Sequence, residues 1–99
     1  MKQTLTKQEI NSLFKEGKWL VSQNLKVVYK PSSNFGYMVS APIKKFKKAN
    51  KRNKIKRLLR LSLQNFNKPF YISIIYNSDE ILDFDTITKE VDKLLTKIS

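Results

Sequence analysis

Residues 46–66, F-K-K-A-N-K-R-N-K-I-K-R-L-L-R-L-S-L-Q-N-F, are the most basic part of the chain and one of its clearest helical patterns. At 3.6 residues per turn, an apolar stripe falls on one side of this segment. The stripe consists of Ile55, Leu58, Leu59, Ser62, Leu63 and Phe66. A polar set lies about a third of a turn away. It consists of Arg52, Asn53, Lys56, Arg57 and Arg60. The segment is therefore predicted to be a helix that packs on a core and presents groups suited to phosphate oxygens.

Such a basic face can also be an ordinary solvated surface. The charge of the whole chain helps to distinguish this alternative from a binding function. The 99 residues predict one domain spanning residues 1–99, with 20 Lys and Arg against 8 Asp and Glu. A net charge of +12 indicates a polyanionic partner, with nucleic acid ahead of an anionic membrane surface. No apolar run approaches the roughly 18 residues needed to span a bilayer, and residues 1–10 lack the apolar core of a secretory signal.

The residue types that are missing narrow the chemistry. The chain contains no histidine and no cysteine, which excludes the usual zinc sites, histidine-based acid–base catalysis and disulfides, and suits a cytoplasmic protein. All eight carboxylates lie in the two ends, and none falls between Gly17 and Ser78. A protein nuclease would normally hold metal ions with carboxylates beside its phosphate-binding surface. We therefore expect a chain that binds a polyanion without cutting it with its own side chains.

Flanking patterns predict the other elements. Thr6 and Glu9 form a capping-box pattern that opens a short helix ending at Gly17, and Asp83 or Asp85 is expected to cap a final helix. The apolar face of that final helix carries Ile87, Val91, Leu94, Leu95 and Ile98. Strand formers occur at 19–21 and 25–29, and residues 35–40 and 70–76 are two further strands.

The order helix–strand–strand–strand–helix–strand–helix predicts an α+β domain with a sheet of about four strands. The turn cluster at 31–34 predicts a hairpin between strands 25–29 and 35–40, and the apolar strand 70–76 is expected inside the sheet. The central helix is expected to begin between Phe46 and Ala49 and to end around residues 65–68. If the strands beside it are parallel, the general rule predicts a right-handed crossover.

The run R-N-K-I-K-R-L-L-R at residues 52–60 resembles the signature of the protein subunit of bacterial ribonuclease P. Val39-Ser40, Lys44-Lys45 and Ala49 resemble its upstream flank, and Leu5, Phe14 and Gly17 match the first helix of that family. The resemblance implies a fold like that of ribosomal protein S5 domain 2, with an unusual left-handed crossover around the motif helix. That expectation takes precedence over the general handedness rule.

The same resemblance implies a division of labour. The partner would be a catalytic RNA that coordinates Mg²⁺ and removes the 5′ leader from precursor tRNA, with one protein per RNA and no catalytic residue in the protein. The implied RNA-binding residues are Lys44, Lys45, Lys48, Lys51, Arg52, Asn53, Lys56, Arg57 and Arg60. A cleft between the first helix and the sheet would hold the leader through Phe14, Ile10 and Val28. Ile10 and Val28 stand at or near positions where this family commonly has aromatic residues.

Two other classes remain open at this stage. A generic RNA-binding or ribosome-associated protein would use the same basic helix without a leader cleft and without any effect on tRNA cleavage. A DNA-binding module would insert the helix into a major groove, but no second helix follows at helix-turn-helix spacing. A protein-only enzyme is the weakest alternative, because the central region lacks an acid or base suited to hydrolysis.

Overall fold

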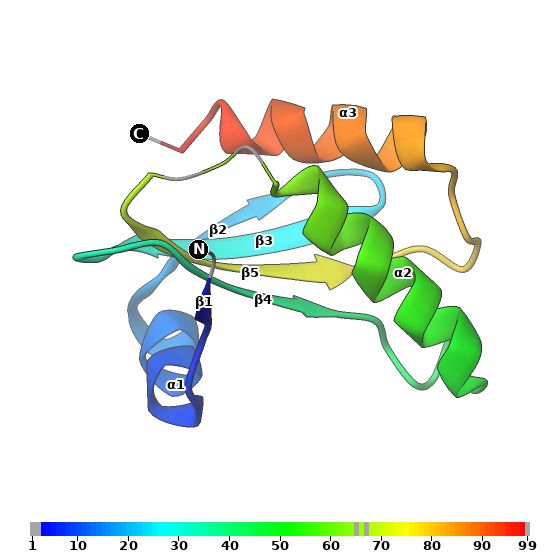
Figure 1. Ribbon diagram of the computed structural model, residues 1–99, viewed down its shortest axis with the longest axis horizontal. Helices are drawn as coiled ribbons and strands as arrows, with labels where there is room; N and C mark the ends of the chain where they lie inside the picture. The colour runs from blue at the N-terminus through cyan, green and yellow to red at the C-terminus, as the bar shows by residue number, and fades with distance from the viewer. Residues whose placement is uncertain (1–2, 65, 67, 99) are drawn as a thin grey trace.

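A five-stranded mixed sheet in the order β1-β4-β5-β3-β2 forms the middle layer of the molecule, which we describe from a computed structural model (Figure 1). The structure describes residues 3–64, 66 and 68–98. The elements are β1 (Gln3–Thr4), α1 (Lys7–Glu16), β2 (Lys18–Val21), β3 (Leu25–Pro31), β4 (Gly36–Ser40), α2 (Ala49–Ser62), β5 (Phe70–Tyr76) and α3 (Phe84–Leu95). The predicted order of three helices and four longer strands is confirmed, and the short β1 is added at the edge beside β4.

The predicted hairpin between β3 and β4 is wrong, because β5 lies between these two strands. It pairs antiparallel with β3, from Leu25–Tyr76 to Pro31–Phe70, and parallel with β4. The turn residues at 31–34 specify only that the chain reverses direction there. A nearly continuous apolar strand needs cover on both faces, so β5 takes the centre of the sheet, as expected from its composition.

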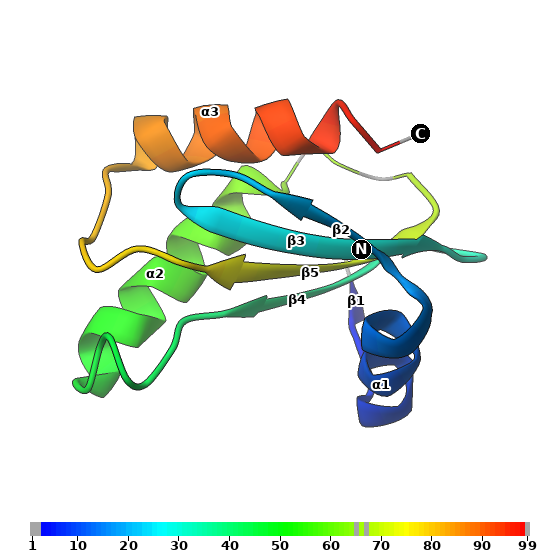
Figure 2. The same ribbon diagram turned by 180° about the vertical axis from the view of Figure 1, so that it is seen from behind.

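The connection from β4 through α2 to β5 is left-handed. In Figure 1, β4 and β5 both point to the right, α2 lies on the viewer's side of the sheet, and the chain moves upward from β4 to β5. Figure 2 shows the same arrangement from behind, with α2 on the far side. The handedness expected from the family resemblance is therefore confirmed, and the general rule for such crossovers fails here.

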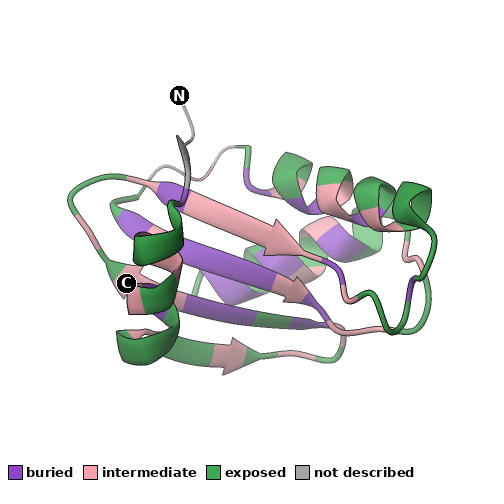
Figure 3. Cartoon of the chain, turned by 90° about the horizontal axis from the view of Figure 1, so that it is seen from below, coloured by how far each residue is buried: buried purple, intermediate pink, exposed green. Residues whose placement is uncertain are grey.

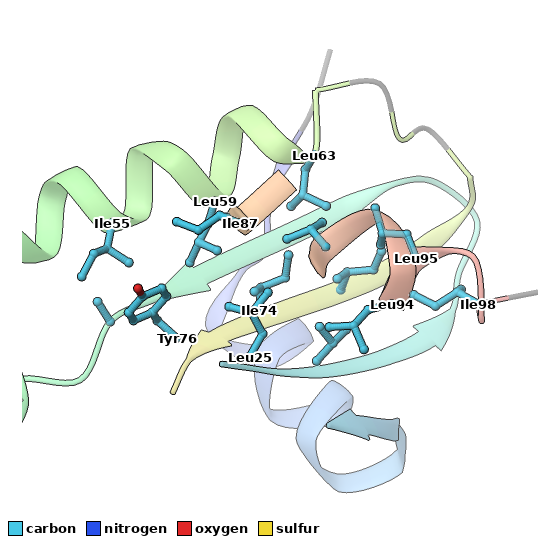
Figure 4. Packing of buried hydrophobic residues seen from close by; sticks show 14 of the residues in the cluster. Leu25, Ile55, Leu59, Leu63, Ile74, Tyr76, Ile87, Leu94, Leu95 and Ile98 are labelled. Carbon is cyan, nitrogen blue, oxygen red and sulfur yellow. The ribbon is translucent and has the colours of Figure 1, made fainter. Parts of the chain in front are cut away.

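The main core lies between the sheet and the pair α2 and α3 (Figure 4). Alternate residues of β3 and β5 point into it, including Leu25 and Ile74, and meet Leu59 of α2 and Leu94 of α3, all of them at most 2% exposed. Tyr76 is also fully buried there, and its hydroxyl accepts a hydrogen bond from the Leu82 backbone N–H at 3.0 Å. This hydroxyl anchors the loop that leads into α3.

The helix ends differ slightly from the predictions. Helix α2 ends at Ser62, before the expected residues 65–68, and a hydrogen bond from the Leu63 N–H to the Arg60 carbonyl tightens its end. Residues 65 and 67 lie outside the described part of the chain. Asp83 caps α3, accepting from the Thr86 N–H at 3.1 Å, so the first of the two proposed caps is correct. Among the described residues, no helix is long and apolar enough to cross a bilayer.

Helix α1 covers the opposite face of the sheet through a smaller core of Leu5, Leu13 and Val28 (Figure 3). The predicted capping box is present: the Thr6 N–H donates to Glu9 Oε1 at 2.8 Å, and the Glu9 N–H donates to Thr6 Oγ1 at 3.2 Å. Gly17 ends the helix, where an added Cβ would collide with the Leu13 carbonyl and Val28. A glycine is required there by close approach of the backbone, since its φ of −73° suits any residue.

The capping box should make the stability of the protein depend on pH. The Thr6 N–H and, secondarily, the Tyr71 hydroxyl lower the pKa of Glu9 from its ordinary value of 4.5. A carboxylate with a lowered folded-state pKa stabilises the fold above its unfolded pKa, and that contribution is lost as the pH falls through the folded value. We expect the wild type to be more stable than Glu9→Gln at pH 7, with the difference shrinking below about pH 4.5. Thermal unfolding of both proteins from pH 7 to pH 3 measures this, and a constant difference would contradict it.

Candidate nucleic-acid interface

Helix α2 separates its two faces as the sequence predicts. Ile55 and Leu59 are buried in the main core, while Asn53, Arg57 and Arg60 are exposed and Lys56 is half-buried. Within the described part of the chain, the guanidinium groups of Arg57 and Arg60 form no ion pair. Guanidinium groups without an internal ion-pair partner keep their hydrogen-bond donors available for an external anion.

A shallow groove runs along part of this face of α2. The groove is lined by Asn50, Asn53, Lys54, Arg57 and Arg60. Asn50 and Lys54, and likewise Asn53 and Arg57, are four positions apart, and Arg60 follows three positions later, so these residues lie along one side of the helix. Asn50 and Lys54 were not among the predicted RNA-binding residues. Their helical spacing from Asn53 and Arg57 was the signal that could have identified them.

Arg52 has a role in the structure that the sequence did not indicate. Its Nη1 atom donates to the Phe46 carbonyl at 2.7 Å and to the Lys47 carbonyl at 2.9 Å. The N-cap residue, Lys48, makes no side-chain capping bond, and the first turn contains no acidic residue. Arg52 therefore fixes the loop entering α2, and only the rest of its half-buried guanidinium faces an external ligand.

The loop before α2 adds further cations. Lys44, Lys45, Lys48 and Lys51 are all exposed, as the predicted basic approach requires. Lys45 Nζ lies 3.3 Å from Asp79 Oδ1, but the Asp79 side chain is 85% exposed. Exposed pairs of this kind contribute about 0–1 kcal/mol, so this pair does not prevent Lys45 from binding a phosphate.

The three residues predicted to form a leader cleft occupy different depths. Phe14 is 36% exposed at the surface of α1, and Ile10 is half-buried against the smaller core. Val28 is fully buried beneath α1, where it packs with Leu5 and Leu13, and its side chain offers no surface to a ligand. The structure thus brings Phe14 and Ile10 to this surface and separates Val28 from it.

A fourth residue joins this surface. Trp19 on the edge strand β2 is 47% exposed, and its ring centroid lies 5.7 Å from that of Phe14, with the ring planes tilted by 37°. In the sequence Trp19 appeared only as a strand former. Its nearness to Phe14 depends on how α1 packs against the sheet.

Two acidic residues of the C-terminal part, Asp83 and Glu90, have structural roles. Asp83 caps α3, and the Glu90 carboxylate accepts from the Asn24 N–H at 2.9 Å and from Asn24 Nδ2 at 3.0 Å, tying the β2–β3 turn to α3. Within the described residues, no group of three acidic side chains is arranged to hold a metal ion. These carboxylates therefore provide no metal-ligand set beside the basic face.

Fold and surface together define a small α+β protein with an exposed basic face on α2. The family model described as Ribonuclease P matches residues 2–99. The ribonuclease P protein components of two strains of Porphyromonas gingivalis are 35% identical over 109 residues, which cover 94% of this chain and 80% of theirs. The chain belongs to the ribonuclease P protein family, and its role is accordingly in tRNA processing, with an RNA partner.

Solved structures agree with this assignment. The RNase P protein from Thermotoga maritima has a TM-score of 0.86 and 26% identity, and the match covers 98% of both chains. The RNase P protein of Staphylococcus aureus has a TM-score of 0.83 at 17% identity, covering 95% of this chain and 93% of that one, and supports the fold alone.

Proposed function

We propose that this chain is the noncatalytic subunit of a ribonucleoprotein whose RNA performs the hydrolysis that removes the 5′ leader of precursor tRNA. The observation that supports this best is the exposed face of α2, where Arg57 and Arg60 lack internal partners among the described residues. Helix α2 and the loop before it carry no carboxylate of their own, and within the described residues the only carboxylate ion-paired with that loop is that of the exposed Asp79. In this proposal the protein alone is inactive.

The basic face would bind phosphates of the catalytic RNA. Arg57 and Arg60 can each hold a phosphate through two parallel N–H bonds, whereas Lys56 acts as a point charge and Asn53 donates an amide N–H. The exposed lysines of the approach loop, Lys44, Lys45, Lys48 and Lys51, would extend the contact along the RNA backbone. Arg52 would contribute partly by holding this loop in place.

Magnesium belongs to the RNA in this proposal. The reaction would use Mg²⁺, a hard cation that prefers oxygen ligands. The part of the chain that the structure describes offers no cluster of three acidic side chains for it, so these residues do not form an all-protein magnesium site. The protein would instead neutralise phosphates around the metal-binding RNA and so reduce the magnesium concentration that assembly requires.

The leader would bind on the α1 side of the sheet, with Phe14 as the exposed aromatic and Ile10 beside it. Val28 would act from beneath, by supporting α1. Aromatic rings stack on single-stranded bases without strong sequence preference, which suits leaders of varied sequence. The proposed assembly contains one protein per catalytic RNA and acts on precursor tRNA in the cytoplasm.

Cleavage of a precursor tRNA by a bacterial ribonuclease P RNA at low magnesium tests the proposal. We expect added protein to restore cleavage at the mature 5′ end, and the protein without RNA to give no product. Heat-denatured protein serves as the control for carrier effects. Tight RNA binding with no gain in cleavage, after a cognate RNA has been tried, would favour a generic RNA-binding protein instead.

A further inference from the structure

Phe14 and Trp19 form an aromatic pair on the surface of the molecule. Phe14 is 36% exposed and Trp19 47% exposed, yet their rings contact one another across two elements. Trp19 lies on β2, the edge strand, directly opposite the buried Val28 and hence on the face of the sheet that α1 covers. The pair therefore stands where the covered part of this face ends.

Beyond the pair, the same face continues without a helix over it. The next row across the sheet contains Val21, Lys26 and Ile75, which are paired with one another in register. Val21 is 64% exposed and Lys26 is exposed, while Ile75 is half-buried. This row is an open, partly apolar surface with an ammonium group on it.

The charges around the pair favour an anionic occupant. Lys15 follows Phe14 in the last turn of α1, and Lys26 lies two residues from Val28, the β3 partner of Trp19; both lysines are exposed. Of the nearby acids, Glu16 is engaged by Lys30 at 3.1 Å, and Glu90, which lines a hollow with Val21, is engaged by Asn24. No carboxylate occurs in the whole of β2 and β3. Flat aromatic rings bordered by cations are the combination that binds single-stranded nucleic acid.

We propose that Trp19 and Phe14 form a stacking platform for a base of the RNA single strand, extending the leader surface from α1 onto β2. The platform rests on the function proposed above. Phe14 provides the wall on α1, and the indole of Trp19 provides the exposed ring face. Lys26 lies on the same face of the sheet, two residues from Val28, the β3 partner of Trp19. It is placed to contact the phosphate next to the stacked base. Trp19 is thus a substrate-binding residue that determines how strongly this protein distinguishes precursor from mature tRNA.

The chain supplies its own probe, because Trp19 is its single tryptophan. The wild-type protein, assembled with a bacterial ribonuclease P RNA, is mixed with three ligands in a stopped-flow fluorimeter before cleavage occurs. The ligands are precursor tRNA with an oligouridine leader, the same precursor with an abasic leader, and mature tRNA. We expect the uridine leader to change the tryptophan emission and the other two to leave it nearly unchanged. Equal changes with uridine and abasic leaders would overturn the stacking proposal.

Two variants separate stacking from simple apolar packing. Trp19→Phe keeps a ring face, whereas Trp19→Leu keeps an apolar side chain against Phe14 without one. We expect Trp19→Leu to reduce the ratio of precursor to mature tRNA affinity about fivefold or more, the lower range for one stacked base, and Trp19→Phe to reduce it less. Phe84→Ala, which removes an exposed aromatic at the start of α3 (42% exposed), is the matched control and should leave the ratio unchanged.

The outcomes distinguish this proposal from the one on which it rests. If the wild type supports cleavage and Trp19→Leu retains the wild-type affinity ratio, the platform is wrong and the subunit function stands. If the wild type fails to support cleavage by a cognate RNA, the proposed function itself is wrong. Should Trp19→Leu fold poorly, the fluorescence comparison of uridine and abasic leaders on the wild-type protein still decides the matter.

Discussion

Replacing both Arg57 and Arg60 by glutamine is expected to weaken assembly with a ribonuclease P RNA by about 100-fold or more. Each arginine is exposed on the unpaired face of α2, and a hydrogen bond to a charged group contributes about 1.5–3 kcal/mol. Glutamine keeps the helix propensity and much of the side-chain length, so the loss reflects the missing guanidinium groups. Filter binding or fluorescence anisotropy with labelled RNA, at fixed magnesium and monovalent salt, measures the change.

The matched control is the double change Lys93→Gln and Lys97→Gln, near the C-terminal end of α3 and just beyond it. It removes the same two positive charges from exposed positions outside the basic helix. We expect this control to reduce affinity only slightly, while the arginine variant also lowers the slope of log affinity against log salt by about one unit per arginine. Equal losses in both double variants would show that the binding is a diffuse charge effect.

Leu59→Ala is expected to reduce the free energy of unfolding by about 2–5 kcal/mol, a large part of the 5–15 kcal/mol typical of a small domain. Leu59 is fully buried in the C-terminal half of α2 and packs in the main core with residues of β5 and α3. Truncation removes apolar burial and leaves a cavity that neighbouring side chains fill only in part. Urea unfolding followed by circular dichroism measures the loss as a lower transition midpoint with an unchanged slope.

Leu61→Ala provides the control on the same helix. Leu61 lies two residues away and is 44% exposed, so the same chemical change should alter stability by about 0.5 kcal/mol or less. If the two variants lost equal stability, α2 would not be seated on the core through the predicted stripe. The comparison therefore tests the orientation of α2, which decides the direction in which Arg57 and Arg60 point.

Much of the candidate site could be predicted from the helix pattern alone. The positions of Ile55, Leu59 and Arg60 in the sequence determine which side of α2 is buried and which is basic. Each residue is rotated by a fixed angle from the one before it, so the spacing sets the face on which each side chain lies. The capping box of Thr6 and Glu9 and the cap at Asp83 were also recognisable, since each joins residues three positions apart. The assignment of individual RNA contacts remains a prediction.

Other features required the folded chain. The sequence did not indicate that Arg52 donates to the carbonyls of Phe46 and Lys47, since basic residues in a phosphate-binding pattern look alike. Nor did it show that Val28 lies beneath α1, because both faces of β3 carry apolar residues and only packing shows which helix covers each face.

By itself, the sequence determined the three helices, the separation of charge from apolar surface on α2, the apolar character of β5 and the motif of the family. These features arise from interactions between residues within one or two helical turns, or from composition. Only the tertiary structure decided that β5 separates β3 from β4 and that Trp19 lies beside Phe14. The left-handed crossover was expected from the family motif, and the general rule of handedness would have predicted the opposite. Strand order and contacts between elements depend on residues far apart in the chain, which must be buried together, and no local pattern encodes which of them meet.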